Sequence, residues 1–234
     1  MKTKRTFGFL STLLVAGAAA ITLTGCKPAL VDYAKGETPS QGLAFTLVTK
    51  GTEAYDSFKD YITPVDEFYI VSGRGTCTDK TIVVPETYEG KPVKGFGERA
   101  FFGDADVEGF ILPNGVETLT NLAFGRTQIK VMKANGVRAY SGGSTGDLLM
   151  DDIVCSQVTE YLGQWAFFFQ TQAKTIWLPK TLKKFGPQPF MDSSIATIRY
   201  EGSEADWKKI EYETGECDFP HINLEYNVKY PGIK

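Results

Sequence analysis

Side chains that could carry out catalysis are few in this chain of 234 residues. His221 is the single histidine, so a His-based triad or a multi-histidine metal site cannot be built. Acidic residues gather in three places, at Asp66–Glu67, at Asp104, Asp106 and Glu108, and at Asp151–Asp152. Two carboxylates held ~5 to ~9 Å apart across a cleft can hydrolyse glycosides. Nothing in the sequence places two of these groups face to face, so we interpret them as solvated turn charges and His221 as a surface or capping residue.

The four cysteines do not form a pattern typical of a metal site. They are Cys26, Cys77, Cys155 and Cys217. With Cys26 assigned to the N-terminal signal, three remain, and three cannot all pair within one chain. Their spacings do not suit zinc, and we expect no disulfide, no metal and no cofactor.

The first 26 residues read as an export signal. Lys2, Lys4 and Arg5 precede an almost uncharged apolar stretch, and the segment ends in Leu23-Thr24-Gly25-Cys26. This order is typical of a secretory signal peptide rather than a membrane span. The ending resembles the lipobox of bacterial lipoproteins, which implies cleavage after residue 25 and a diacylglyceryl anchor on Cys26. The alternative is an ordinary secreted protein with a fortuitous cysteine.

Charge argues against nucleic acid as a partner. Removing residues 1–25 takes away three basic residues and no acidic ones, which leaves 22 basic against 28 acidic residues. Affinity for nucleic acid depends on neutralising phosphates with basic patches. The chain is 42% hydrophobic, which is enough for a continuous core.

Two columns of apolar residues recur along the chain about every 22 residues. In the first column, apolar residues two positions apart begin at Ile82, Phe110, Met132, Ile153, Ile176 and Ile198. The second contains Phe96, Leu119, Tyr140, Leu162 and Phe185, each followed five residues later by Phe101, Phe124, Thr145, Phe167 and Phe190. A fixed period of this length predicts a solenoid whose coils bury their apolar faces against one another. The middle repeat departs most, because Ser141–Gly146 replaces an Ala-Phe turn; it is either a flexible bulge or the loss of one turn with the ladder kept.

Strand alternation predicts which side chains face outward. If Ile82 and Val84 point inward, the residue between them points outward, as do its equivalents in later repeats. This register exposes one column made of Ile111, Lys133, Val154, Trp177 and Arg199. Trp and Arg are prominent in interface hot spots, so these five residues are our candidate partner-binding patch. The alternative is that this face is covered by another segment or unused.

The rest of the chain divides around the repeats. We expect a tether over residues 26–42, an N-terminal β cap over 43–80, the solenoid over 81–200 and a C-terminal helix-and-strand cap over 201–234. Ser203 and Asp206 resemble a capping box that starts a short helix near Glu204. Trp207 would then cover the last repeat.

Several motifs resemble one family of bacterial repeats. Phe96-Gly97-Glu98-Arg99-Ala100-Phe101 with Phe110-Ile111-Leu112-Pro113, and Leu162–Phe167 with Ile176–Pro179, resemble BspA-like leucine-rich repeats. The resemblance implies a mainly β fold with short helical turns: a right-handed leucine-rich-repeat solenoid with one short parallel strand per repeat, capped at both ends. Such repeats often carry cysteine three residues after the turn phenylalanine, and this chain does not.

The leading hypothesis is a monomeric, non-enzymatic lipoprotein on the outside of a bacterial cell, which binds an extracellular protein or matrix component through its strand face. Glycan binding is the second hypothesis. Phe167-Phe168-Phe169 suggests a sugar platform, although Phe167 falls at a core position. A glycoside hydrolase and a purely structural envelope protein are the remaining alternatives.

Overall fold

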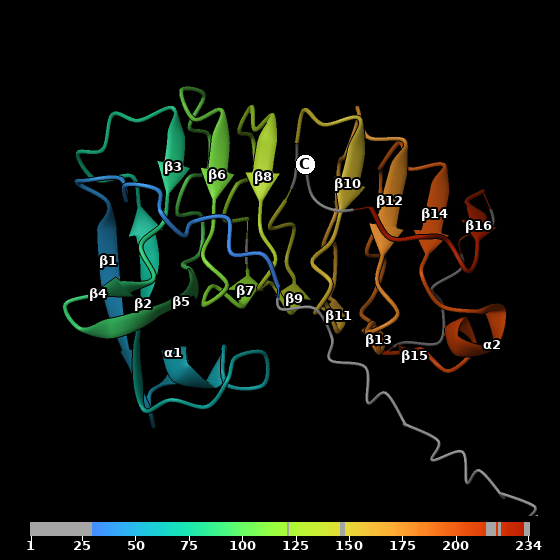
Figure 1. The fold of residues 1–234 in the computed structure, drawn as a ribbon, viewed down its shortest axis with the longest axis horizontal. Coiled ribbons are helices and arrows are strands. Elements are labelled where there is room, and N and C mark those ends of the chain that lie inside the picture. The colour runs from blue at the N-terminus through green and yellow to red at the C-terminus, as the bar shows by residue number, and fades with distance from the viewer. Residues whose placement is uncertain (1–29, 121, 146–147, 214–218, 220, 232–234) are drawn as a thin grey trace, which may run out of the picture.

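The computed structural model describes residues 30–120, 122–145, 148–213, 219 and 221–231, and shows a stack of coils between two caps (Figure 1). The expected mainly β solenoid with parallel strands is confirmed. Helices in the described residues are the short α1 (Glu53–Asp56) and α2 (Glu204–Trp207). None of the helices in these ranges is long and apolar enough to cross a membrane. The predicted signal peptide and Cys26 lie outside the described residues.

The first strand ladder has the predicted register. Ile82 pairs with Phe110 and Phe110 with Met132; Ile153 pairs with Ile176 and Ile176 with Ile198, all in parallel. The ladder consists of β3 (Thr81–Val83), β6 (Gly109–Ile111), β8 (Val131–Lys133), β10 (Asp152–Val154), β12 (Thr175–Leu178), β14 (Thr197–Tyr200) and β16 (Asn223–Glu225). It is made of two sheets, β3-β6-β8 and β10-β12-β14-β16, because β8 and β10 do not pair.

Alternate side chains of these strands form the core. Ile82 and Val84 are fully buried, and so are Ile176, Leu178 and their equivalents in most coils. Phe110 lies among rings from neighbouring coils, with centroids 4.6 Å from Phe124 and 4.9 Å from Phe101. Each buried aromatic or aliphatic side chain of this size contributes about 1.5–3 kcal/mol relative to an exposed one. A single coil could not bury these groups without its neighbours.

Each coil also contributes a second short strand, which the sequence pattern did not predict. These strands pair in parallel in the order β5 (Lys91–Phe96), β7 (Thr118–Leu119), β9 (Ala139–Tyr140), β11 (Tyr161–Leu162), β13 (Lys184–Phe185) and β15 (Glu211–Tyr212). They coincide with the second apolar column of the sequence. At Gly95 the coils approach so closely that a Cβ would lie 2.9 Å from the carbonyl oxygen of Thr118, which explains the glycine.

The N-terminal cap extends the second ladder. β1 (Ala44–Thr49) and β2 (Glu67–Gly73) form an antiparallel pair, and β2 then pairs in parallel with β5. The segment between β1 and β2 packs α1 and the following turn into a small separate core of Val48, Tyr55, Phe58, Ile62, Phe68 and Ile70. The segment after β3 forms a hairpin in which β4 (Thr87–Tyr88) pairs with β5.

The C-terminal cap follows the predicted pattern. Ser203 caps α2 and shares a complete capping box with Asp206. Trp207 is buried, with its ring centroid 5.3 Å from that of Tyr200 and 5.6 Å from that of Phe185. β16 adds the closing strand of this cap and pairs in parallel with β14.

The middle repeat differs from both expectations. Its turn is kept: the amide of Leu122 donates to the carbonyl of Gly142, the amide of Phe124 to that of Ser144, and the amide of Gly142 to that of Gln164. The interruption falls in the first strand ladder instead, between β8 and β10, and Figure 1 shows these two strands set apart.

The described part of the expected tether lies against the coils. Side-chain amides of Asn114 and Asn135 donate to the carbonyls of Leu30 and Val31. Ser40 donates its amide to the carbonyl of Val83, and its hydroxyl accepts from the Val83 amide. From Leu30 onward, therefore, this segment makes hydrogen bonds to the solenoid that the tether interpretation did not include.

Candidate recognition surface

The predicted patch lies on the outward side of the first ladder, in two parts. Ile111 pairs with Lys133, and Val154 pairs with Trp177, which pairs with Arg199. All five residues are half-buried, as outward side chains between neighbouring strands should be. Lys133 and Val154 stand on opposite sides of the interruption, so the column is not the continuous row that the sequence suggested.

Trp177 and Arg199 form the best-defined contact of the patch. The guanidinium carbon of Arg199 lies 4.8 Å from the centroid of the Trp177 ring, within cation–π range. The Nε of Arg199 also lies 2.9 Å from a carboxylate oxygen of Glu225 on β16. Arg199 is therefore held between an aromatic face and an anion, which leaves a preorganised aromatic–cation pair on the outward side of the ladder.

The N-terminal end of the same face is closed. Ser40 pairs with Val83 through two hydrogen bonds, and Val83 is buried although its register points outward. At β3, the first strand of the ladder, the outward face is therefore covered by another segment, which is the alternative that the sequence left open. The available part begins at Ile111.

A groove opens where the two sheets separate. Its volume is about 350 Å³, and its apolar lining includes Met132, Ala134, Tyr140, Leu148, Met150, Ile153 and Phe167. Thr145 stands where four other repeats have phenylalanine, and its hydroxyl donates to the carbonyl of Ala166. Threonine cannot fill the space of a phenyl ring, which leaves room for this groove beside an otherwise continuous core. Lys130, Asp152, Val154 and Trp177 also border the groove, which therefore adjoins the predicted patch.

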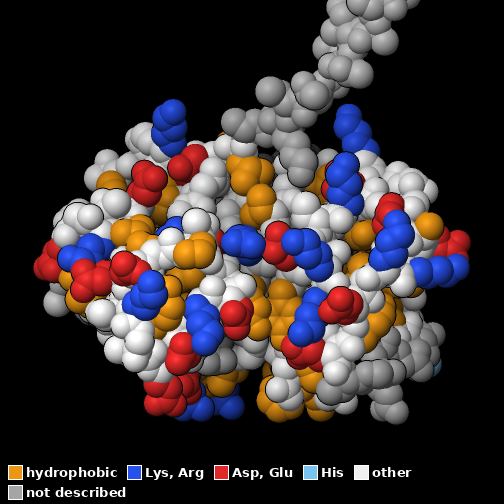
Figure 2. All heavy atoms as spheres, turned by 90° about the horizontal axis from the view of Figure 1, so that it is seen from below, with side chains coloured by type: hydrophobic (Ala, Val, Ile, Leu, Met, Phe, Trp, Pro, Cys, Tyr) orange, Lys and Arg blue, Asp and Glu red, His pale blue; other side chains and the backbone are white. Residues whose placement is uncertain are grey.

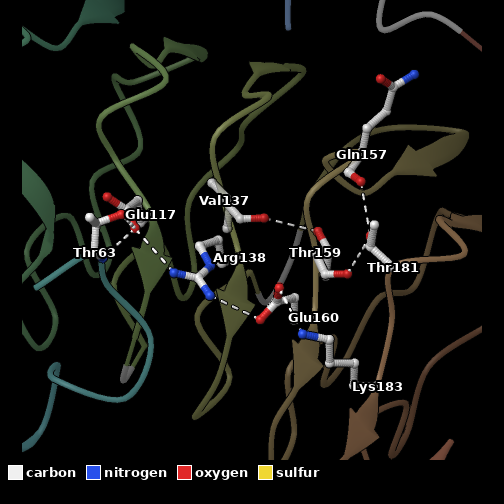
Figure 3. Close-up of polar contacts among 9 residues, drawn as sticks. All are labelled: Thr63, Glu117, Val137, Arg138, Gln157, Thr159, Glu160, Thr181 and Lys183. Carbon is white, nitrogen blue, oxygen red and sulfur yellow. Dashed lines mark hydrogen bonds and ion pairs between the residues drawn. The ribbon is translucent and has the colours of Figure 1, made fainter. Parts of the chain in front are cut away.

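A ladder of alternating charges runs along the second strand column, and sequence reasoning missed it. Glu117 lies 2.5 Å from Lys94 and 3.6 Å from Arg138. Arg138 then pairs with Glu160 at 3.0 Å, and Glu160 with Lys183 at 3.0 Å. Figure 3 shows the Glu117–Lys183 part of this row, with each charged side chain reaching toward the next coil. Figure 2 looks onto this side of the molecule, where basic and acidic side chains lie beside one another.

The charge ladder ties the N-terminal cap to the solenoid. The amide and hydroxyl of Thr63 both donate to one carboxylate oxygen of Glu117, at 2.6 and 2.9 Å. The ring of Tyr61 stacks on Tyr161 with centroids 5.1 Å apart. Burial acts to raise the pKa of Glu160, but hydrogen bonds from Arg138 and Lys183 outweigh it and hold that pKa below the ordinary value. These charges are largely satisfied by one another, which favours a stabilising role for this side.

The signal for the charge ladder was present in the sequence. Lys94, Glu117, Arg138, Glu160 and Lys183 follow each other at 23, 21, 22 and 23 positions, the spacings of the second apolar column. Alternation of sign at the repeat period would have predicted neighbouring ion pairs on stacked coils.

An exposed aromatic cleft lies at the compact turns. It has a volume of about 400 Å³ and is lined by Phe102, Leu122, Gly125, Arg126, Gly143, Phe168 and Phe169. Phe169 is 47% exposed and the nearby Trp165 is 41% exposed, whereas Phe167 is buried in the core as expected. The guanidinium carbon of Arg126 lies 5.5 Å from the Phe102 ring centroid.

The acidic clusters are mostly paired with cations. Asp104 accepts from Arg74 at 2.8 Å, Glu108 contacts Lys80 and Lys130, and Asp66 contacts Lys50. Asp151 accepts from the side chain of Gln172. Over the described ranges, no group of three or more His, Cys, Asp or Glu side chains could hold a metal ion.

The described cysteines are buried thiols. Cys77 and Cys155 are both free, and burial raises the pKa of the Cys155 thiol. Cys217 lies outside the described residues. His221 is exposed.

Comparison with known proteins agrees with this architecture. The BspA-type leucine-rich repeat region matches residues 94–214 in six copies. A leucine-rich repeat protein of T. pallidum is similar in structure, with a TM-score of 0.53 and 19% identity over 80% of this chain and 85% of that one. A leucine-rich cell surface protein of Faecalibacterium prausnitzii has a TM-score of 0.55 and 17% identity, over 64% of this chain and 39% of that one. No curated protein matches this chain.

These structural similarities concern the fold alone, but the repeat match covers just over half of the chain, from Lys94 to residue 214. The stacked register, the two apolar columns and the parallel ladders are the features that such a repeat region requires. The chain belongs to the BspA-type leucine-rich repeat family.

Proposed function

We propose that this protein is a lipid-anchored bacterial surface protein that recognises a partner protein through the outward side of its first strand ladder. The observation that carries the proposal is the Trp177–Arg199 pair, which is held outward by β12, β14 and Glu225. Large aromatic and arginine side chains on a rigid scaffold lose little conformational entropy on binding. The printed description of the F. prausnitzii relative as a cell surface protein supports an exterior location.

The contacts of the N-terminal segment fit this arrangement. Cys26 precedes Leu30 by four residues, a span of at most about 14 Å when extended. Leu30 is held by Asn114, which follows β6. With an anchor on Cys26, the part of the protein nearest to the bilayer would be the turns that follow the strands of the first ladder. The outward side chains of β12 and β14 would stay uncovered. Substitution Cys26→Ser should abolish incorporation of labelled fatty acid; persistent labelling at the N-terminus would reject the anchor.

Binding experiments on the full chain test the recognition surface. Proximity labelling on intact cells would first identify a partner, whose affinity is then measured with purified proteins. We expect Trp177→Ala or Arg199→Ala to weaken binding by about 30-fold or more, the effect of losing one hot-spot residue. Lys183→Gln, a charge change on the opposite strand column, is the matched control and should leave affinity unchanged. Equal affinity of all variants would reject the patch.

Glycan binding is a second candidate because of the aromatic cleft. Exposed Trp165, Phe169 and Phe102 beside Arg126 present the flat apolar surfaces on which sugar rings stack. A glycan array probed with the full chain and with Phe169→Ala tests this candidate. Glycan binding through this cleft predicts an array signal that is lost in the Phe169→Ala variant and kept in the Trp177→Ala variant. We propose no catalytic role, since the acidic residues considered for hydrolysis at Asp66, Asp104 and Glu108 are engaged by cations.

A further inference from the structure

β1 is the outermost strand of the long sheet, and its outer edge is open. The sheet begins in the order β1-β2-β5, and no strand of the described chain pairs with β1 on the side away from β2. Figure 1 shows β1 at the N-terminal end of the row of strands. Its sequence, Ala44–Thr49, contains no charged residue and no proline, two features with which proteins commonly protect a sheet edge. An edge of this kind is a template for an added strand.

The pairing with β2 determines which backbone groups of β1 point outward. The amide of Lys50, just after the strand, donates to the carbonyl of Asp66, which makes these two a hydrogen-bonded pair. Such pairs alternate along an antiparallel ladder, so Val48 and Thr46 are the next residues that bond to β2. The one irregularity of the register lies at Ala44, before this alternating part begins.

The backbone groups between these positions face the open edge. They include the amides and carbonyls of Phe45 and Leu47, and those of Thr49 point the same way. The carbonyl of Thr49 is already engaged, since it accepts from the amide and the hydroxyl of Thr52 at 3.2 and 2.7 Å. Phe45 and Leu47 therefore offer two donors and two acceptors to an added strand.

Apolar side chains accompany these open groups. Leu47 lies opposite Tyr69 and is 42% exposed. The Phe45 ring lies 6.3 Å from that of Tyr69 and stacks on Tyr88, with centroids 4.1 Å apart. Tyr88 is itself 37% exposed. Phe45 and Leu47 thus share one face of the edge, and the exposed Thr46 points to the other.

We propose that β1 pairs antiparallel with β1 of a second copy of this chain, about a two-fold axis at Thr46. This register places Phe45 opposite Leu47 of the partner subunit, and the reverse, so their open amides and carbonyls form four hydrogen bonds. Apolar side chains then meet on one face, and Thr46 meets its own equivalent on the other, a favourable cross-strand pair. An axis at Leu47 would instead place Phe45 opposite Thr49, whose carbonyl is occupied.

The composition of the edge favours a second copy as its occupant. Symmetric pairing brings identical charges close together wherever an edge carries them, and like charges directly opposite each other are destabilising. β1 carries none. The dimer would replace the monomer expected from the sequence, and it depends neither on the lipid anchor nor on the Trp177–Arg199 pair.

Native mass spectrometry of the full chain in detergent tests the dimer. The wild type at about 100 µM should show twice the monomer mass, a concentration chosen because small interfaces bind weakly. Thr46→Lys and Thr46→Glu should each raise the dissociation constant by about tenfold or more, because each places like charges opposite each other. An equimolar mixture of the two variants should dimerise at least as well as the wild type, which misfolded variants could not do.

Thr49→Lys is the matched control, because Thr49 is also exposed on β1 but lies outside the paired residues. This variant should keep the dimer. A wild type that stays monomeric, or dimers that persist in both Thr46 variants, overturn the proposal. A mixture that stays monomeric, or a dimer lost equally in Thr49→Lys, overturns the axis at Thr46.

Cysteine cross-linking tests the register independently. Opposed residues of a non-hydrogen-bonded pair have Cα atoms about 4.5 Å apart, within disulfide range, so Thr46→Cys should give a covalent dimer on oxidation. Thr49→Cys should not, since the two equivalents would lie roughly 20 Å apart. Both variants also carry Cys26→Ser and Cys217→Ser, so that only the buried Cys77 and Cys155 remain beside the new thiol. Equal cross-linking of the two variants, or none with Thr46→Cys, would contradict the register.

Discussion

Glu117 joins the second strand ladder to the N-terminal cap, and Glu117→Gln should destabilise the protein more than the same change elsewhere in the charge ladder. Its side chain is 8% exposed and that of Lys94, 2.5 Å away, is 12% exposed. Glutamine keeps an oxygen that can accept from Thr63, so the main loss is the negative charge between Lys94 and Arg138. Removing one partner of a buried pair costs about 3–5 kcal/mol. Because Arg138 keeps its ion pair with Glu160, we expect Glu117→Gln to lower the free energy of unfolding by about 2–4 kcal/mol.

Urea unfolding of the full chain in detergent measures this loss. With a slope of about 2 kcal/mol/M, the midpoint should fall by about 1–2 M. Glu160→Gln is the matched control, since Glu160 also lies between two cations but is 33% exposed. We expect it to cost about 1 kcal/mol or less, as more exposed pairs do. Equal shifts for the two variants, or no shift for Glu117→Gln, would refute the reasoning that burial and the contact with the cap make Glu117 distinctive.

Three further outcomes follow from local contacts. Ser203→Ala should lower stability by about 1 kcal/mol and increase exchange in α2, because it removes the side-chain cap; unchanged exchange there would argue against the capping box. Gly136→Ala should lower the thermal midpoint, since the added Cβ would lie 2.1 Å from the carbonyl oxygen of Asn114, and a wild-type midpoint would contradict this close approach. The pKa of Glu160 lies below its usual 4.5, so its carboxylate stabilises the fold fully above pH 4.5. This contribution should be lost as the pH falls through the lowered pKa. Asp206, whose pKa is lowered to about 2 by hydrogen bonds from Lys209 and Ser203, should lose its contribution between about pH 4 and 2, and NMR titration of both carboxylates checks these signs.

Strand register was predictable because one side chain per coil must fill one layer of the core. The 22-residue recurrence from Ile82 to Ile198 placed each strand, and alternation then separated buried from outward residues. Capping chemistry was equally local, since Ser203 and Asp206 satisfy each other within one turn. These features depend on spacing within the sequence and need no knowledge of distant contacts.

The interruption between β8 and β10 depends on volume rather than pattern. The sequence showed that Thr145 departs from the repeat pattern. Whether the turn or the strand ladder is interrupted depends on how Ala134, Leu148 and Phe167 pack around the space that Thr145 leaves. The contacts of Leu30 and Ser40 with the coils could not be predicted from the sequence either. They join Leu30 to Asn114, 84 positions away, and Ser40 to Val83, 43 positions away.

Radical footprinting of the full chain with and without its identified partner tests the central claim most directly. The account predicts that oxidation of Trp177 on β12 falls when the partner binds, while that of Trp165, exposed at the compact turns, stays constant. Protection of Trp165 with no change at Trp177 would contradict recognition through the strand face.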